Sequence, residues 1–253
     1  MARVDLVGIR HGYDLPGGGR REVLRDLGLS FRPGGFHVIL GRSGCGKSTL
    51  LRLIAGLERP DAGEITTGGA RIGIVFQEPR LMPWLTVAGN AGFLVKGRGD
   101  AGETADRVAR ALATVGLTEA ARQWPGQLSG GMAQRVAIAR ALVTEPEVLL
   151  MDEPFGALDA FTRKQMQDEL VEIWARLGQT VVFITHDIDE ALRLGQFIFV
   201  IEAGRVALDL ALDASLPRGG AEPAVNAARQ RLLDQLFARA APPGWADQPK
   251  EHP

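Results

Sequence analysis

A glycine-rich segment with one lysine is the part of this sequence best suited to chemistry. Residues Gly41–Ser48 have the sequence G-R-S-G-C-G-K-S, between the apolar run Phe36–Leu40 and the helical pattern Ser48–Leu57. This matches G-x-x-x-x-G-K-[ST] in the strand-to-helix context that the motif requires. Glycines let backbone N–H groups turn toward a phosphate, and a helix N-terminus adds partial positive charge. The alternative is a glycine-rich turn that happens to contain a lysine.

The motif predicts a role for each part of this loop. We expect Lys47 to bridge the β- and γ-phosphates of a nucleotide, and the Ser48 hydroxyl to ligate Mg²⁺. The other candidate nucleotide-binding residues of the segment are Gly41, Arg42, Ser43, Gly44, Cys45, Gly46 and Thr49.

Two acidic residues follow another apolar run. Asp152 and Glu153 come directly after Val148–Met151, which predicts a buried strand. In a doubly wound sheet the carboxyl ends of the strands face the ligand crevice. Asp152 is therefore a candidate for holding Mg²⁺ through water, and Glu153 for a general base, a role that contributes typically ~10²–10⁴-fold in rate. An Asp-Glu pair after a strand is also common in ordinary surface turns. The catalytic interpretation therefore depends on the presence of the phosphate loop in the same chain.

A short motif distinguishes among the many proteins that have phosphate loops. Leu128–Met132 has the sequence LSGGM and precedes the helical stretch Ala133–Leu142. It resembles LSGGQ, the signature of the ATP-binding-cassette family, with Met132 in place of the glutamine. The resemblance implies that Ser129, Gly130 and Gly131 contact a phosphate. The alternative, a serine N-cap on an amphipathic helix, accounts for the serine but not for the two glycines.

The resemblance runs from about Val4 to Val206 and implies further site residues. Gln77 matches a glutamine that contacts Mg²⁺ and senses the membrane subunits, and Asp159 belongs to a loop that crosses the dimer interface. Tyr13, the only tyrosine, matches an aromatic residue that stacks on adenine. His186, after the run Val181–Thr185, matches a histidine that contacts the γ-phosphate. The implied catalytic set is Glu153, His186, Gln77 and Lys47, and the implied metal ligands are Ser48, Gln77 and Asp152.

Short apolar runs that alternate with helical patterns predict an α/β fold with a mainly parallel sheet. The resemblance makes this a P-loop NTPase, with a RecA-like core, an antiparallel edge sheet and an inserted helical subdomain. Expected strands are 36–40, 73–76, 148–151, 181–185 and 197–201. One helix is expected because Met166, Leu170, Ile173 and Leu177 recur at i, i+4, i+7 and i+11. A second, weaker pattern of the same kind comprises Val108, Leu112 and Val115.

These patterns also suggest domain boundaries. The nucleotide-binding domain is expected over residues 1–210, with its helical subdomain at about 78–145, where no strand is expected. Pro and Gly become frequent after Leu216. Residues 211–253 are therefore expected to be a partly mobile extension, with a helix at about 227–239.

Composition limits the function classes. A formal net charge of −1 gives no support for nucleic-acid binding. One cysteine, Cys45, excludes an internal disulfide and fits a reducing compartment. The first residues lack the apolar region of a secretory signal, and no apolar run approaches the ~18–20 residues that span a bilayer. We therefore expect a soluble chain whose membrane role comes through a partner.

The family resemblance implies a mechanism and partners. ATP is expected to bind head to tail in a homodimer, between Gly41–Ser48 of one subunit and Ser129–Gly131 of the other, with Mg²⁺. Two transmembrane permease subunits and, indirectly, an extracytoplasmic solute-binding protein are the implied partners, at the cytoplasmic face of the inner membrane. Trp84 and Leu85 are suitably placed to dock on a permease, or alternatively form the core of the helical insert.

Three stretches narrow the resemblance. FQEPRLMPW, QWPGQLSGGMAQRVAIARAL and DEPFGALDAFTRKQMQDEL are similar to ATPases of nitrate, sulfonate and taurine importers, most closely the aliphatic sulfonate importers. Uptake of nitrate, taurine or another small solute is an alternative, as is an exporter or a ribosome- or DNA-directed family member. Exporter cassettes are often fused to membrane spans, and the soluble members usually have two cassettes in one chain. This sequence shows neither feature. A small-molecule kinase would lack the LSGGM motif.

Overall fold

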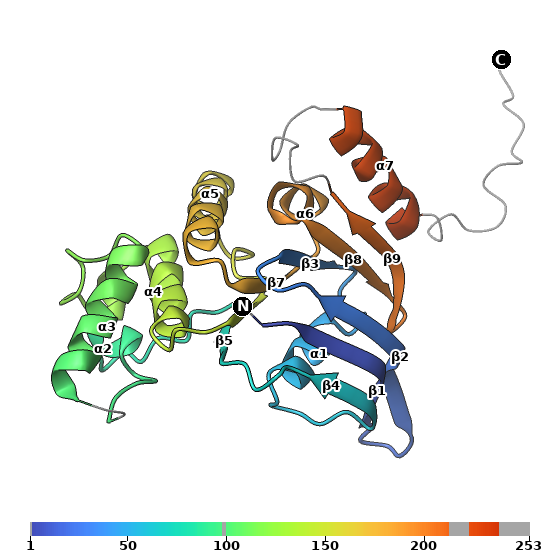
Figure 1. The fold of residues 1–253 in the computed structure, drawn as a ribbon, viewed down its shortest axis with the longest axis horizontal. Coiled ribbons are helices and arrows are strands. Elements are labelled where there is room, and N and C mark those ends of the chain that lie inside the picture. Colours follow the sequence, from blue (N-terminus) through green and yellow to red (C-terminus); the bar gives the residue numbers. More distant parts are fainter. Residues whose placement is uncertain (1, 98–99, 213–222, 238–253) are drawn as a thin grey trace, which may run out of the picture.

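The computed structural model describes residues 2–97, 100–212 and 223–237 (Figure 1). Its larger sheet has six strands in the order β5-β6-β7-β3-β8-β9. Neighbours from β5 to β8 are parallel, and β9 is antiparallel to β8. The strands are β3 (Phe36–Leu40), β5 (Ile72–Val75), β6 (Val148–Asp152), β7 (Thr180–Thr185), β8 (Phe197–Glu202) and β9 (Arg205–Ala211). The five strands expected from apolar runs are thus present, each within one residue of its expected bounds.

Strand β3 is buried along its whole length because both faces of the sheet are covered. Phe36, Val38 and Leu40 face a core formed largely with α4, α5, α6 and α7. Ile39, on the opposite face, packs with residues of α1 and of a second sheet. The alternation follows the two-residue period of a strand.

The second sheet is antiparallel, with the order β2-β1-β4. It contains β1 (Val4–Asp14), β2 (Arg20–Phe31) and β4 (Ala62–Thr66), and lies beside α1 (Lys47–Ile54) (Figure 1). The family resemblance implied such a sheet, but its strands have no clean alternation in the sequence. The register of β1 against β2 shifts between Leu6 and Ile9 and again before Gly12. Each bulge adds a residue and so breaks the two-residue period.

Three helices lie between β5 and β6 in the chain. They are α2 (Val87–Ala91), α3 (Ala101–Thr114) and α4 (Gly130–Leu142), with a 3₁₀ turn at Pro125–Gln127. The described residues of 78–145 contain no strand, as expected. In Figure 1 these helices form a group at one side of the larger sheet. Trp84 is 69% exposed, so the buried-core alternative is wrong for this residue, whereas Leu85 is half-buried.

The remaining helices pack on the main core of the larger sheet (Figure 1). They are α5 (Ala160–Leu177), α6 (Ile188–Leu194) and α7 (Pro223–Phe237). Helix α7 begins four residues before its expected start and buries Val225, Ala228 and Leu232 in the main core. Residues 213–222 and 238–253, where mobility was expected, lie outside the described residues. The division of the chain at residue 210 stays a prediction.

Helix α1 ends at Ile54, three residues before its predicted end. Gly56 follows with φ 71°, in the left-handed region that commonly terminates helices. Among the described residues no helix combines the length and apolarity needed to cross a bilayer.

Candidate nucleotide-binding site

The glycine-rich loop connects β3 to α1 at the carboxyl end of the central strand. Gly46 has φ 108°, and a Cβ built on it would lie 2.8 Å from Cδ2 of Leu24. A Cβ on Gly41 would lie 2.5 Å from the carbonyl oxygen of Ile201. Both positions therefore require glycine, one for its backbone conformation and one for the close approach of β8.

Lys47 begins α1, and its side chain is folded back into the loop. Its Nζ donates hydrogen bonds to the carbonyl oxygens of Gly41 at 2.7 Å and Arg42 at 3.2 Å. The residue is only 5% exposed, and Oε1 of Glu153 lies 3.8 Å from Nζ. A buried ammonium that has one carboxylate and two carbonyls around it is ready to exchange some of them for phosphate oxygens.

Ser48 and Asp152 bring a hydroxyl and a carboxylate together. The Ser48 hydroxyl donates to Oδ1 of Asp152 at 3.1 Å, although 104 residues separate them in the chain. Burial raises the pKa of the Asp152 carboxyl, the Ser48 hydrogen bond offsets part of this rise, and the charge of Glu153 adds to it. Hard oxygen donors of this kind are the ligands that Mg²⁺ prefers. The pair therefore fits the predicted metal site.

Glu153 has a strained backbone next to this pair. Its φ is 42°, which is uncommon for a residue with a side chain, and its N–H donates to the carbonyl of Ile184 at 3.0 Å. Its Oε2 lies 2.9 Å from Nδ1 of His186. Because a carboxylate only accepts, this hydrogen bond needs a proton on Nδ1. Strain of this kind clusters at functional sites, where the surrounding structure enforces it.

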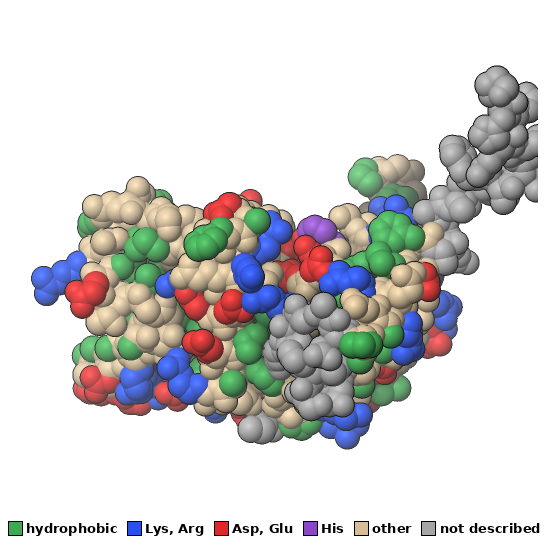
Figure 2. Space-filling view, turned by 90° about the horizontal axis from the view of Figure 1, so that it is seen from above, with side chains coloured by type: hydrophobic (Ala, Val, Ile, Leu, Met, Phe, Trp, Pro, Cys, Tyr) green, Lys and Arg blue, Asp and Glu red, His purple; other side chains and the backbone are tan. Residues whose placement is uncertain are grey.

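His186 is 60% exposed in its side chain, whereas His11 and His37 are buried. Figure 2 shows a histidine at the surface beside acidic side chains. The Glu153 carboxylate, at 19% exposure, therefore lies between the buried Lys47 and an open histidine.

Sheet order explains why these residues meet. The strands β5, β6, β7 and β3 are successive neighbours. Gln77 lies just beyond β5, Asp152 and Glu153 at the end of β6, His186 after β7, and the phosphate loop after β3. Parallel strands end at the same edge, so one edge of the sheet collects all four groups. Gln77 is exposed, and its Nε2 would lie 3.2 Å from a Cβ built on Gly156, in the turn after Glu153.

The predicted signature begins α4. Ser129 is its N-cap, and its hydroxyl accepts from the N–H of Met132 at 3.3 Å. The N-cap interpretation is therefore right as geometry, and it leaves Ser129 and Gly130 exposed. A Cβ on Gly131 would lie 2.8 Å from Cγ2 of Thr162, so close packing on α5 accounts for one of the two glycines. Their phosphate-binding role stays a prediction.

Asp159 is the N-cap of α5. Its carboxylate accepts from the N–H groups of Thr162 at 3.0 Å and Phe161 at 3.1 Å. Hydrogen bonds hold the pKa of Asp159 below its usual value. Those from Thr162 contribute most, and the one from Phe161 contributes less. Within this chain the carboxylate is occupied by its own helix, and contact with a nucleotide stays a prediction.

Tyr13 lies near the end of β1 and is 38% exposed. Its hydroxyl donates to Oε2 of Glu58 at 2.7 Å and lies 3.3 Å from Oγ1 of Thr49. The structure thus connects Tyr13 to α1, close to the phosphate loop. Glu58 was not predicted, because in the sequence it is one of several polar residues in a turn after a helix.

Comparison with known proteins identifies the class. A sequence model of the family described as ABC transporter matches residues 24–156. The dimeric structure of the bacterial ABC transporter cassette MJ0796 superposes with a TM-score of 0.74 at 34% identity, covering 83% of this chain and 99% of that one. The structure of the same cassette in a post-hydrolysis state with ADP and phosphate superposes with a TM-score of 0.73, at 34% identity and with the same coverage. The chain belongs to the ABC transporter family, and the predicted fold, family and ATPase class are confirmed.

Curated relatives narrow this further. The aliphatic sulfonates import ATP-binding protein SsuB of Ralstonia nicotianae is 45% identical over 241 residues, 92% of this chain and 83% of the relative. SsuB 1 of Burkholderia cenocepacia is 47% identical over 239 residues, 92% of this chain and 73% of the relative. The SsuB protein of Pseudomonas putida is 43% identical over 238 residues, which are 91% of this chain and 85% of the relative.

Proposed function

We propose that this chain hydrolyses ATP at the sheet edge described above and thereby powers import of aliphatic sulfonates. The observation that carries the proposed hydrolysis is the position of the Glu153 carboxylate, 3.8 Å from Nζ of Lys47 and 2.9 Å from Nδ1 of His186. The proposed substrate follows from the similarity to the sulfonate import proteins. A carboxylate in that place can polarise a water molecule against a phosphate held by Lys47.

Each residue has a distinct task in the proposed reaction. Lys47 exchanges carbonyl partners for β- and γ-phosphate oxygens, and the loop N–H groups bind the remaining phosphate charge. Glu153 accepts the proton of the attacking water, and His186 orients that carboxylate and contacts the γ-phosphate. Ser48, Asp152 and Gln77 would hold Mg²⁺, which would supply charge neutralisation for the phosphates.

The site is completed by a second copy of the chain. The exposed Ser129 at the start of α4 is directed to the γ-phosphate bound by the partner subunit, and Gly130 and Gly131 permit close approach. ATP then joins the two subunits, and hydrolysis lets them separate. The dimeric state of the cassette MJ0796 supports this arrangement.

The proposed partners are two permease subunits and, through them, an extracytoplasmic solute-binding protein. The chain is placed at the cytoplasmic face of the membrane. Trp84, exposed and seven residues after Gln77, supports a docking surface on the helical group.

The substrate is tested in the assembled transporter. The chain is reconstituted in liposomes with its permease and binding protein, and ATP hydrolysis is measured with an alkanesulfonate, taurine or nitrate. The proposal expects the alkanesulfonate to give the largest stimulation. Equal or larger stimulation by taurine or nitrate would assign the transporter to that solute and leave the ATPase proposal intact.

A further inference from the structure

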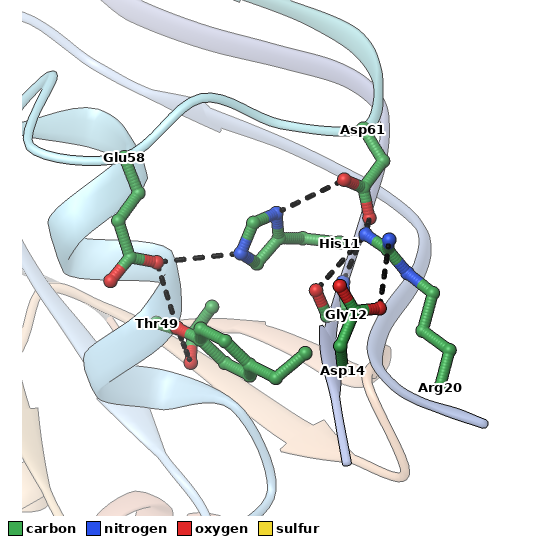
Figure 3. Close-up of polar contacts among 8 residues, drawn as sticks. His11, Gly12, Asp14, Arg20, Thr49, Glu58 and Asp61 are labelled. Carbon is green, nitrogen blue, oxygen red and sulfur yellow. Dashed lines mark hydrogen bonds and ion pairs between the residues drawn. The ribbon is translucent and has the colours of Figure 1, made fainter. Parts of the chain in front are cut away.

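The carboxylate of Glu58 accepts one hydrogen bond, from Tyr13, and lies close to two further side chains at the end of the smaller sheet. Its Oε2 accepts the Tyr13 hydrogen bond at 2.7 Å and lies 3.4 Å from Nε2 of His11. Its Oε1 lies 3.5 Å from Nη1 of Arg52. Figure 3 shows Glu58 facing both His11 and Thr49. With 26% of its side chain exposed, the Glu58 carboxylate is partly shielded from water.

The strand that carries Tyr13 is held at the same place. The His11 ring is 8% exposed and packs edge-on against the Tyr13 ring, with centroids 5.1 Å apart at 88°. Nδ1 of His11 lies 3.8 Å from Oδ1 of Asp61. The N–H of Gly12 donates to Oδ2 of Asp61 at 2.9 Å, and Arg20 pairs with the same carboxylate (Figure 3). The backbone just before Tyr13 is therefore tied to Asp61.

The network also reaches the nucleotide-binding helix. The Tyr13 hydroxyl lies 3.3 Å from Oγ1 of Thr49, which directly follows Ser48 on α1. Anchoring the hydroxyl end fixes the direction of the ring, while 38% of the residue stays exposed for a ligand. An aromatic ring that is already ordered loses less freedom when a base stacks on it.

We infer that Glu58 is a positioning residue for the nucleotide base, which acts by holding the Tyr13 ring beside α1. The inference rests on the proposed role of Tyr13 in stacking on adenine. Glu58 does not touch the nucleotide. Its removal affects recognition of the base and leaves the phosphate loop intact.

The test compares ATP with inorganic tripolyphosphate, which has the phosphates but no base. In the full chain, Glu58→Ala is expected to weaken ATP binding about 3–10-fold, the size expected for the loss of one typical hydrogen bond. Tripolyphosphate affinity and kcat stay within about twofold of wild type, and KM for ATP rises. Glu58→Gln, whose amide oxygen still accepts from the phenol, restores most of the affinity. Glu64→Ala, an exposed glutamate on β4, is the matched control and changes nothing.

A double-mutant cycle tests whether Glu58 acts through the phenol. Tyr13→Phe keeps the ring and loses the hydroxyl, so it is expected to weaken ATP about as much as Glu58→Ala. The double variant is expected to be no weaker than either single variant. Additive effects, equal loss of tripolyphosphate affinity, or unchanged or tighter ATP binding in Glu58→Ala would each overturn the inference.

A spectroscopic signature separates positioning from general destabilisation. Because Tyr13 is the only tyrosine, protein labelled with 3-fluorotyrosine gives one ¹⁹F resonance. It is expected to shift or broaden in nucleotide-free Glu58→Ala but not in Glu64→Ala. An unchanged resonance would contradict the inference.

Tyr13→Ala distinguishes this inference from the proposed function. Loss of base stacking lowers ATP affinity by roughly 5–100-fold and leaves tripolyphosphate unaffected. If Tyr13→Ala leaves ATP affinity unchanged, the stacking role of Tyr13 fails, and the inference fails with it. If Tyr13→Ala has the expected effect and Glu58→Ala has none, only the inference fails.

Discussion

The Nδ1 atom of His186 lies 2.9 Å from Oε2 of Glu153, across the carboxyl ends of two neighbouring strands. The other carboxylate oxygen of Glu153 faces the buried ammonium of Lys47 at 3.8 Å. One carboxylate thus connects a buried lysine of the glycine-rich loop with an exposed histidine, and Glu153 adopts a positive φ at this position.

Glu153→Gln keeps the size of the side chain and removes its charge. ATP is expected to bind normally, while turnover falls by about 10²–10⁴-fold because the amide cannot take a proton from water. The nucleotide-bound dimer accumulates and is visible by size-exclusion chromatography. The control is Glu172→Gln on the exposed face of α5, which keeps wild-type turnover. Near-wild-type turnover in Glu153→Gln would remove this residue from the role of base.

Cys45 offers a chemical test of the phosphate loop. It is the only cysteine, and burial raises the pKa of its thiol. Alkylation by a maleimide is therefore expected to be slow at neutral pH and faster as pH rises, since the thiolate reacts. The thiol packs close to Gly41, where a Cβ would lie 2.7 Å from Sγ. The adduct should block ATP binding, and ATP should slow alkylation. Normal hydrolysis by fully alkylated protein would contradict this position for Cys45.

His37 makes the stability of the core depend on pH. Burial lowers its pKa from 6.5 to about 4, and its Nε2 accepts from the N–H of Arg32 at 2.9 Å. The unfolded chain binds a proton below about pH 6.5, whereas the folded chain does so only near pH 4. Stability is therefore lost as pH falls through this window, by about 2 kcal/mol between pH 7 and pH 5 from this residue alone.

The measurement is urea denaturation of wild type and His37→Gln at several pH values. The variant is expected to be less stable at pH 7 but to show a shallower decrease between pH 7 and pH 5. Identical slopes for the two proteins would show that His37 is not the residue responsible.

Site residues were predictable when they lie in one continuous motif or follow strands whose ends must meet at the same edge of the sheet. Lys47 and Ser48 lie in one continuous motif, and Asp152 follows an apolar run whose strand had to end at the same edge. Ser48 and Asp152 are 104 residues apart in the chain and 3.1 Å apart in the structure. Their proximity follows from parallel strands that end at the same edge of the sheet. The start of α4 was also predictable, since Ser129 is an ordinary N-cap, whereas the N-cap role of Asp159 was not predicted.

The network around Glu58 was not predictable by the same reasoning. Tyr13 and Glu58 come from different elements, and neither has a spacing that indicates the other. The strand that carries Tyr13 is bulged, so its alternation is broken. Similarly, Glu190 in α6 accepts hydrogen bonds from Gln167 at 3.0 Å and from Thr185, a buried arrangement. Such contacts depend on how elements pack, which local patterns do not encode.

The central claim is that each ATP is bound between two copies of this chain. Lys47→Ala removes the positive charge between the β- and γ-phosphates and should inactivate both sites of a homodimer. Ser129→Arg should inactivate both by filling the space for the partner's γ-phosphate. Ser129→Ala, which loses only the N-cap at a cost of about 1 kcal/mol, is the control for folding of α4.

Mixing the two variants gives heterodimers in which one site combines both changes and the other pairs an intact Lys47 with the partner subunit's intact Ser129. The most direct measurement is ATP-dependent dimerisation of this mixture by size-exclusion chromatography. The account predicts that the mixture regains a nucleotide-stabilised dimer that neither variant forms alone. If both variants are folded and no such heterodimer appears, ATP is not bound between Lys47 of one subunit and Ser129 of the other.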